Sequence, residues 1–176
     1  MTKRGDGLKD QRVLITAGAG GIGLATAERL IEEGSNVLVC DVDEGRLGDF
    51  AKRFPDAHTF NADVSDDDAV EALLQHAQAK LGGLDSLINN AGIAGPTGGV
   101  EEVDPAEWRR CIEVCLVGQF LCTHFAVPMI KQAGGGAIIN MSSAAGKHGY
   151  AYRTPYSAAK FGVIGFTQSL AKELGQ

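Results

Sequence analysis

The chain of 176 residues is 44% hydrophobic with only 5 prolines, so it can bury one sizeable core, and we expect a single domain over residues 1–176. Its 22 acidic and 16 basic residues give a net charge of -6, which argues against nucleic acid or a membrane as partner. No leader-like segment and no run near the ~18 apolar residues of a membrane span are present. We therefore expect a cytoplasmic protein whose partners are small molecules and other protein chains.

Short β-branched runs alternate with longer helical patterns along the chain, which is typical of a parallel sheet flanked by helices. The runs are almost continuously apolar, as strands buried on both faces should be. The predicted strands are Arg12 to Thr16, Asn36 to Asp41, Ala57 to Asn61, Asp85 to Asn89 and Ala137 to Met141.

Helical periodicity predicts long helices between and after these strands. The first runs from Ile22 to Glu33, and the second follows an N-cap candidate at Ser65. The third begins after Asp104, with proline at its first position, and continues towards Gly134. The fourth begins near Pro155.

The 4 cysteines fall within these apolar patterns. Cys40 lies in a strand, and Cys111, Cys115 and Cys122 recur at helical spacing. A metal or redox site would need a Cys-x-x-Cys pair or a histidine cluster nearby, so we interpret the cysteines as buried hydrophobic residues and predict no metal site.

A glycine-rich motif, Gly18-Ala19-Gly20-Gly21-Ile22-Gly23, joins the first strand to the first helix. The pattern alone is weak and could be an ordinary turn, but its position is specific, because N–H groups and the dipole at a helix start attract a pyrophosphate. We expect Gly18, Gly21, Ile22 and Gly23 to hold a dinucleotide. The predicted fold is an α/β, Rossmann-type doubly wound parallel sheet in the strand order 3-2-1-4-5, with helices on both faces.

Asp41 closes the second predicted strand, 18 residues after Gly23. This is close to the spacing at which an acidic residue accepts a hydrogen bond from the adenosine ribose, and its charge repels a 2′-phosphate. NAD is therefore favoured over NADP, although Arg46 lies nearby and could favour a phosphate. A solvated aspartate at a strand end is the alternative interpretation.

Together the motifs resemble the short-chain dehydrogenase/reductase family over nearly the whole chain. They are Thr16 to Gly23, Asp63-Val64, Asn89-Asn90-Ala91-Gly92, Ser143, and Tyr156-Ser157-Ala158-Ala159-Lys160. The resemblance implies that Asp63 and Val64 contact the adenine, and that further residues line the cofactor, namely Asn90, Ala91 and Gly92. The asparagines could instead satisfy loop backbone groups.

The resemblance also implies the catalytic residues. Tyr156 would exchange a proton with the substrate oxygen during hydride transfer, and Ser143 would donate a hydrogen bond to that oxygen. Lys160 lies one helical turn from Tyr156, so its charge favours the phenolate, and it would also hold the nicotinamide ribose. We expect an NAD(P)-dependent dehydrogenase/reductase acting on a secondary alcohol or ketone, with Tyr156 and Lys160 also contacting the cofactor NAD.

The sequence departs from the family pattern at three places. Ala17 replaces a glycine of the loop, which could shift its register, and Cys115 replaces a catalytic asparagine that normally helps to hold a relay water. Either catalysis is weakened, or another group such as Asn89 or a backbone carbonyl takes over. The chain also ends at Gln176, where the family continues, so we expect the domain to be incomplete at its C-terminus.

These departures leave alternatives open. A catalytically impaired NAD-binding regulatory or structural subunit is one, and an epimerase or dehydratase with tightly bound NAD is another. The helix after Pro155 is apolar almost all round, so we expect a homodimer or homotetramer packed through it and through the helix after Asp104. Arg153 could bind a substrate carboxylate or be a solvated loop residue.

Overall fold

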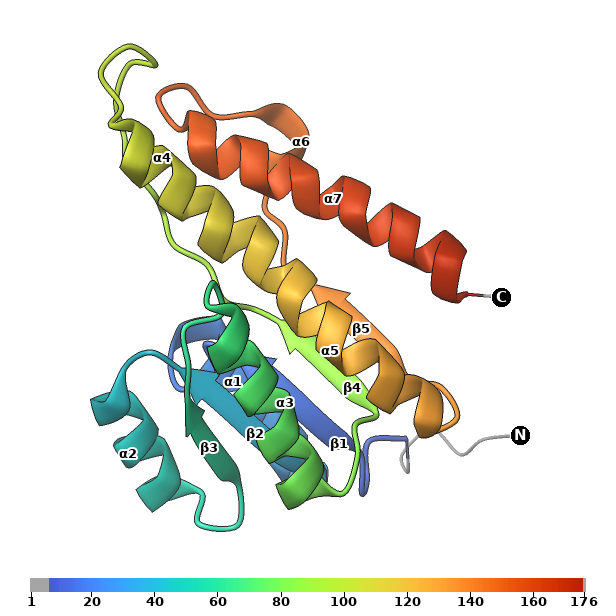
Figure 1. The fold of residues 1–176 in the computed structure, drawn as a ribbon. Helices are drawn as coiled ribbons and strands as arrows, with labels where there is room; N and C mark the ends of the chain where they lie inside the picture. Colours follow the sequence, from blue (N-terminus) through green and yellow to red (C-terminus); the bar gives the residue numbers. More distant parts are fainter. Residues whose placement is uncertain (1–6, 176) are drawn as a thin grey trace. The chain divides into compact units, whose positions relative to one another are not determined.

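A computed structural model describes residues 7–175 of the chain (Figure 1). The strands are β1 (Arg12–Thr16), β2 (Asn36–Asp41), β3 (His58–Asn61), β4 (Ser86–Asn89) and β5 (Ala137–Asn140). The helices are α1 (Gly21–Glu32), α2 (Glu44–Arg53), α3 (Asp67–Leu81), α4 (Pro105–Ile112), α5 (Gly118–Gln132), α6 (Ala145–His148) and α7 (Thr154–Leu174), with a π-helical turn, η1 (Glu113–Val117), between α4 and α5.

The chain divides into two compact units. The first unit contains the residues up to Asn90 together with Leu121–Ile139, and the second unit contains Ala91–Phe120 and the residues from Asn140 onward. The sequence-based expectation of a single domain over 1–176 stays a prediction.

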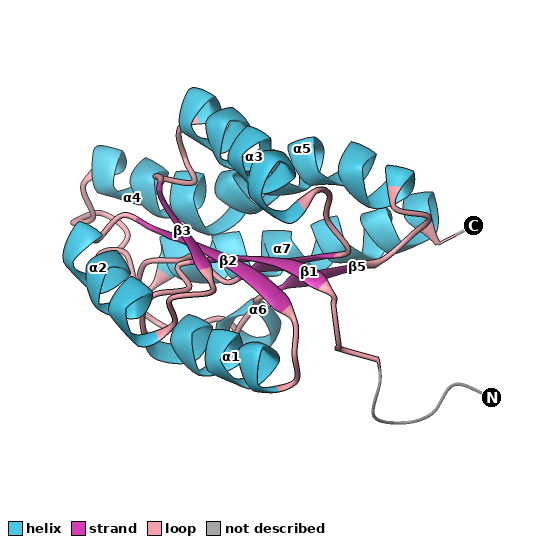
Figure 2. Cartoon of the chain, turned by 90° about the horizontal axis from the view of Figure 1, so that it is seen from below, coloured by secondary structure: helices cyan, strands magenta, loops and turns pink. Residues whose placement is uncertain are grey.

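The first unit is built on a parallel sheet in the strand order β3-β2-β1-β4-β5, which confirms the predicted topology. β1 pairs with β2 from Arg12 opposite Asn36 to Thr16 opposite Cys40, and it pairs with β4 on its other side. Helices α1 and α2 cover one face of the sheet, and α3 and α5 cover the other (Figure 2). Because parallel strands end at the same edge, the residues that follow β1, β2 and β4 are brought to one edge of the sheet.

The prediction that all five strands are buried is confirmed for β1, β2 and β4, whereas no residue of β3 or β5 is fully buried. On one face of the sheet, side chains of β1 and β2 pack with Ala27 of α1 and with Leu47 and Phe50 of α2. In the three central strands only the first residue is open to solvent: it is partly exposed in β1 and β4 and exposed in β2. The hydrophobic runs of the three central strands therefore fold as strands covered on both sides, and the two outer strands do not.

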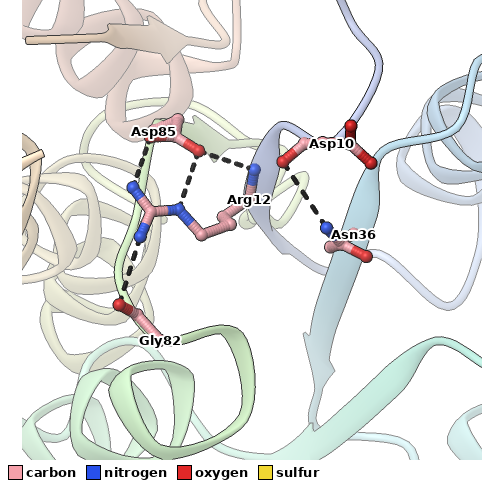
Figure 3. Close-up of polar contacts among 5 residues, drawn as sticks. All are labelled: Asp10, Arg12, Asn36, Gly82 and Asp85. Carbon is pink, nitrogen blue, oxygen red and sulfur yellow. Dashed lines mark hydrogen bonds and ion pairs between the residues drawn. The ribbon is translucent and has the colours of Figure 1, made fainter.

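An ion pair joins the beginnings of β1 and β4 (Figure 3). Arg12 donates to the carboxylate of Asp85 through Nε at 2.8 Å and Nη2 at 2.6 Å, and its Nη1 bonds the carbonyl of Gly82 at 3.1 Å. The hydrogen bond from Arg12 holds the pKa of Asp85 below its ordinary value. This contact ties the amino ends of β1 and β4 together.

Two helices differ from the sequence-based expectation. The helix α2 is not predicted, because it contains two glycines and only two buried apolar residues, and its start depends on the Asp43 side chain accepting the N–H of Arg46. The helix α3 is capped by Asp66 rather than by Ser65. The predicted cap of α4 is confirmed, because Asp104 accepts N–H groups of the first turn at 2.6 and 3.1 Å.

The second unit holds α4, η1, α6 and α7. Cys111 and Cys115 pack with Ala159 of α7 in a small core. All four cysteines are free and buried, as predicted. The π-helical turn interrupts the expected continuous helix at the position of Cys115, and such turns occur often at functional sites.

Within the described residues, one helical stretch, Pro105–Gln132, is long and apolar enough to cross a membrane by length and composition. Half of its apolar window is buried inside the protein. Core helices of water-soluble proteins have the same properties, so the stretch is weak evidence for a membrane span.

Candidate active site

Two glycines of the motif are required by close packing in the first unit. A Cβ on Gly23 would lie 2.2 Å from the carbonyl oxygen of Ala17, and a Cβ on Gly18 would lie 2.6 Å from Cγ1 of Val39. No side chain fits at such distances, so α1 can begin directly after β1 only with glycine at both positions.

The amino end of α1 has the properties of an anion-binding site. Its N-cap residue Gly20 offers no side-chain cap, and no acidic residue lies in the first turn. Gly21 has a φ of 52°, and a Cβ there would meet nothing within 4 Å, while the neighbouring Ile22 is 65% exposed. Backbone N–H groups and the helix dipole therefore remain available, and the diphosphate of a dinucleotide fits this cradle.

Ala17 adopts a left-handed backbone conformation with a φ of 49°. This conformation costs a residue with a Cβ about 1–2 kcal/mol relative to glycine. The sequence predicts a possible shift in the register of the loop at this position. The described backbone instead places Ala17 itself in the conformation that glycine favours, and the next residue, Gly18, donates its N–H to the carbonyl of Cys40 at 3.0 Å.

Asp41 presents a carboxylate at the same edge of the sheet. One carboxylate oxygen accepts the N–H of Asp43 at 3.2 Å, and no described residue bonds the other oxygen. The side chain is thus oriented and can still accept a ribose hydroxyl. Arg46 lies closer to the cradle than the sequence suggests, because a Cβ on Gly20 would be 3.0 Å from its Nη1, while its Nε pairs with Asp43 at 3.2 Å.

Asp63 and Val64 follow β3. The carboxylate of Asp63 accepts both the N–H and the hydroxyl of Ser65, at 3.0 and 2.7 Å, and so shapes the turn that leads into α3. The side chain of Val64 is buried. Their contact with an adenine stays a prediction.

The two asparagines after β4 have different partners. Asn90 donates through Nδ2 to the carbonyls of Thr16 at 3.0 Å and Ala17 at 3.1 Å, so it holds the glycine-rich loop in place. Asn89 is buried and donates to the hydroxyl of Thr123 on α5 at 3.1 Å. Asn89 thus serves packing within the first unit, and the cofactor contact of Asn90 stays a prediction.

The catalytic candidates Tyr156 and Lys160 lie one turn apart on α7 in the second unit. Lys160 is 4% exposed, its Nζ donates to the carbonyl of Met141 at 2.7 Å, and it lies 5.7 Å from the centroid of the Tyr156 ring. Burial lowers the pKa of Lys160, and the nearby thiols of Cys115 and Cys111 oppose that shift. No described residue bonds the Tyr156 hydroxyl, which is therefore available to a ligand.

The turn after β5 packs against α7 at Lys160. The hydroxyl of Ser142 donates to the carbonyl of Lys160 at 2.8 Å, and a Cβ on Gly146 would lie 2.5 Å from that carbonyl. The hydroxyl oxygen of Ser143 accepts a backbone N–H two residues later at 3.2 Å, which leaves its own O–H as a donor. The second unit thus brings together the turn that carries Ser143, the Tyr156 phenol and the Lys160 ammonium.

Cys115 forms two hydrogen bonds with one backbone residue. Its Sγ accepts the N–H of Ile93 and donates to the carbonyl of Ile93, both at 3.3 Å. A Cβ on Gly92 would lie 3.5 Å from both Cys115 Sγ and Lys160 Nζ. The thiol therefore holds the segment that contains the predicted residues Ala91 and Gly92 beside Lys160. An asparagine amide also offers an acceptor and a donor, so cysteine provides the kinds of bond that asparagine could make here.

Sequence reasoning missed the backbone partners of this site, namely the carbonyl of Met141 and the N–H and carbonyl of Ile93. Backbone groups are present in every residue, so no sequence pattern could have indicated them. The structure also places Arg153 beside Tyr156, with Cζ 5.4 Å from the ring centroid.

Comparison with known families gives a match over residues 11–176 to the family model described as short chain dehydrogenase. Among curated proteins, the chain is 44% identical over 171 residues to cis-4-hydroxycyclohexanecarboxylate dehydrogenase of Sinomonas cyclohexanicum, covering 95% of this chain and 68% of that protein. It is 41% identical over 161 residues to 2-dehydro-3-deoxy-L-rhamnonate dehydrogenase (NAD(+)) of Sphingomonas sp. (strain SKA58), covering 92% of this chain and 65% of that protein.

Among solved structures, the fold is similar to the crystal structure of levodione reductase. The TM-score is 0.88 at 36% sequence identity, and the match covers 95% of this chain and 67% of the levodione reductase chain. The chain thus spans about two thirds of the length of these relatives.

Proposed function

Because the chain belongs to the short-chain dehydrogenase family, a family of oxidoreductases, we propose that it transfers a hydride between NAD and a secondary alcohol or ketone. The observation that carries the proposal is the pairing on α7 of a buried ammonium group with a phenol whose hydroxyl has no hydrogen-bond partner among the described residues. Both lie in the unit that also contains Ser143.

The residues of the first unit fit the adenosine and diphosphate part of NAD. Gly18, Gly21, Ile22 and Gly23 would surround the diphosphate at the amino end of α1, where backbone N–H groups and the helix dipole favour an anion. The second oxygen of Asp41 would accept a ribose hydroxyl, and its charge would repel a 2′-phosphate. This supports NAD over NADP.

The residues of the second unit fit the chemical step. The bound cofactor would supply or accept the hydride at its nicotinamide ring. The Tyr156 phenol would give a proton to the substrate oxygen or remove one from it, and the Lys160 ammonium would stabilise the phenolate and bond the nicotinamide ribose. The O–H of Ser143 would donate to the substrate oxygen as negative charge develops there.

The relatives support a ring-bearing substrate. Two of the similar curated proteins are named for the oxidation of cis- and trans-4-hydroxycyclohexanecarboxylate, at 44% and 40% identity. We propose a cyclic secondary alcohol, or the corresponding ketone, as the substrate class. Ile93, which bonds Cys115 and is partly exposed, would border the substrate pocket.

Exposed aromatic side chains support the proposal of a homo-oligomer. Phe120 of α5 and Phe161 of α7 are both 48% exposed in the second unit, and such large apolar surfaces mark interfaces when they cluster. We propose a homodimer or homotetramer of a cytoplasmic enzyme, packed through these helices. Sedimentation at micromolar concentration would test this, and a monomer would contradict it.

The experiment that tests the function combines two measurements on the same preparation. A screen of cyclic secondary alcohols with NAD and with NADP should give NADH formation at 340 nm with at least one alcohol and a clear preference for NAD. A fluorescence titration with NADH measures cofactor binding independently. Binding without any turnover would instead favour the impaired regulatory or structural subunit that Cys115 suggests.

A further inference from the structure

Arg153 immediately precedes α7 and is the second cation beside the catalytic tyrosine. Its Cζ lies 5.4 Å from the ring centroid of Tyr156, and the Nζ of Lys160 lies 5.7 Å from the same centroid. Tyr156 is thus contacted by two positively charged groups of the second unit.

The guanidinium of Arg153 is held in a fixed position but is not neutralised. Its Nη2 donates to the carbonyl of Ala94 at 2.6 Å, which is a neutral acceptor. Its Nε is buried and has no hydrogen-bond partner, and no carboxylate of a described residue pairs with this side chain. The side chain of Arg153 is partly exposed, and its two sequence-based interpretations, a carboxylate-binding residue and a solvated loop residue, stay predictions.

The charges beside Tyr156 indicate which kind of ligand Arg153 can bind. A partly buried cation is costly unless an anion compensates it, and a Tyr156 phenolate could compensate only one of the two cations. Lys160 donates to the Met141 carbonyl and has the lower exposure, and the proposed function assigns it to the phenolate. Arg153 is thus the cation that can pair with an anion from outside the described residues.

We propose that Arg153 binds a carboxylate of the substrate while the substrate hydroxyl or carbonyl meets Tyr156. A guanidinium matches a carboxylate with two parallel hydrogen bonds, and a position fixed beforehand by Ala94 and by the tyrosine ring reduces the cost of ordering the side chain. The substrate class is therefore a hydroxy or oxo carboxylic acid. This inference rests on the proposed function for the reaction, but it concerns a separate group of the substrate.

The test compares matched probes with and without charge. The full chain is assayed with NAD on 4-hydroxycyclohexanecarboxylate and on its carboxamide. The proteins compared are the wild type, Arg153→Gln, Arg153→Lys and a control, Arg109→Gln. The control removes an exposed arginine of α4. We expect kcat/KM for the carboxylate to fall about 10- to 100-fold in Arg153→Gln and less in Arg153→Lys, because bonds between charged groups are the strong ones. The kcat/KM of the Arg153 variants for the carboxamide, and the kcat/KM of the control Arg109→Gln for both substrates, should change less than about threefold.

Binding is measured separately from turnover by calorimetric titration with cyclohexanecarboxylate and cyclohexanecarboxamide. We expect the wild type to bind the carboxylate more tightly and Arg153→Gln to lose that preference while its NADH affinity is unchanged. Equal binding of both probes by the wild type, or equal losses on both probes in Arg153→Gln, would overturn the inference and assign Arg153 a purely structural tie to Ala94. Arg153-dependent carboxylate binding without any NAD-linked turnover would retain the inference and reject the proposed function.

Discussion

The candidate sites of the two units are built from different features of the chain. In the first unit the cradle depends on glycines. Neighbouring atoms leave no room for a Cβ on Gly18 or Gly23, and the absence of a side chain on Gly21 leaves the surface of the cradle open. In the second unit the site depends on side chains that other groups hold in place, as the Met141 carbonyl holds Lys160 and the backbone of Ile93 is tied to Cys115.

This difference predicts how each unit tolerates change. No other residue can replace the glycines of a cradle that is built from backbone groups. Substitutions of these glycines should therefore have large effects, on folding as well as on binding. A site that is built from side chains can lose one functional group while the protein stays folded. Substitutions in the second unit should therefore lower the turnover rate rather than the stability.

The largest effect is expected for Gly23→Ala in the first unit. The added Cβ would lie 2.2 Å from a backbone carbonyl oxygen, which cannot move without shifting β1 or α1. We expect the free energy of unfolding to fall by about 3 kcal/mol and NADH binding to be lost. Urea denaturation and NADH titration would measure both.

The matched control is Gly48→Ala, also a helical glycine, around which a Cβ would meet nothing within 4 Å. This variant should be more stable by about 0.5–1 kcal/mol, because alanine favours helix. If Gly23→Ala and Gly48→Ala have the same free energy of unfolding and the same NADH affinity, the close packing of Gly23 against the backbone is not required.

In the second unit, Lys160→Met should lower kcat by about 100-fold or more while the protein stays folded. The stability change should depend on pH. Burial lowers the pKa of Lys160, so the unfolded chain binds more protons than the folded chain between the lowered value and the ordinary 10.5, and wild-type stability rises with pH through that window. Methionine removes this dependence.

Urea denaturation of both proteins between about pH 7 and pH 10 measures this difference. The stability of Lys160→Met relative to wild type should be highest at the lower pH and should decrease as the pH rises. A relative stability that increases with pH would contradict burial of a charged ammonium at this position.

A smaller effect on turnover is expected at Cys115. Cys115→Ala removes both bonds to Ile93, so the segment beside Lys160 loosens and kcat should fall about tenfold, whereas Cys115→Ser keeps a donor and an acceptor and should lose less than about threefold. Cys122→Ala is the control, because Cys122 is equally buried but lies in the first unit. If Cys122→Ala lowers kcat as much as Cys115→Ala, the contact with Ile93 has no special role.

The smallest effect is expected for Ala17→Gly in the first unit. Relief of the left-handed conformation contributes about 1–2 kcal/mol, and the greater freedom of glycine in the unfolded chain offsets about 0.4–1 kcal/mol of it. The free energy of unfolding should therefore rise by about 0.5–1 kcal/mol, as measured by urea denaturation. A loss of stability would show that Ala17 makes contacts that outweigh its backbone strain.

The fold could be predicted from the sequence because its signals are local. The apolar runs, the glycine spacing and the Asp104 cap each follow from a few neighbouring residues, and the bounds of β1 and β2 agree with the structure. The short helix α2 was missed because its two glycines and sparse apolar residues give a weak periodicity. The π-helical turn was missed because its sequence, from Glu113 to Val117, reads as ordinary helix.

The candidate site was predictable only in part. The residue types and spacing of Ser143, Tyr156 and Lys160 favoured dehydrogenase chemistry and left alternatives open, and how their surroundings hold them depends on contacts between distant segments. The bond from Arg153 to the Ala94 carbonyl joins residues 59 positions apart, and nothing in the sequence near Arg153 indicates it. Long-range bonds to backbone groups carry no signal in residue type.

The division of roles between the two units is tested most directly by Tyr156→Phe, measured for NADH affinity and for turnover on the same preparation. The account predicts that the dissociation constant of NADH changes less than about twofold, while kcat falls by about 10²- to 10⁴-fold because the proton-transferring hydroxyl is lost. Turnover like that of the wild type would contradict the account, because the chemistry would then not depend on the phenol of α7.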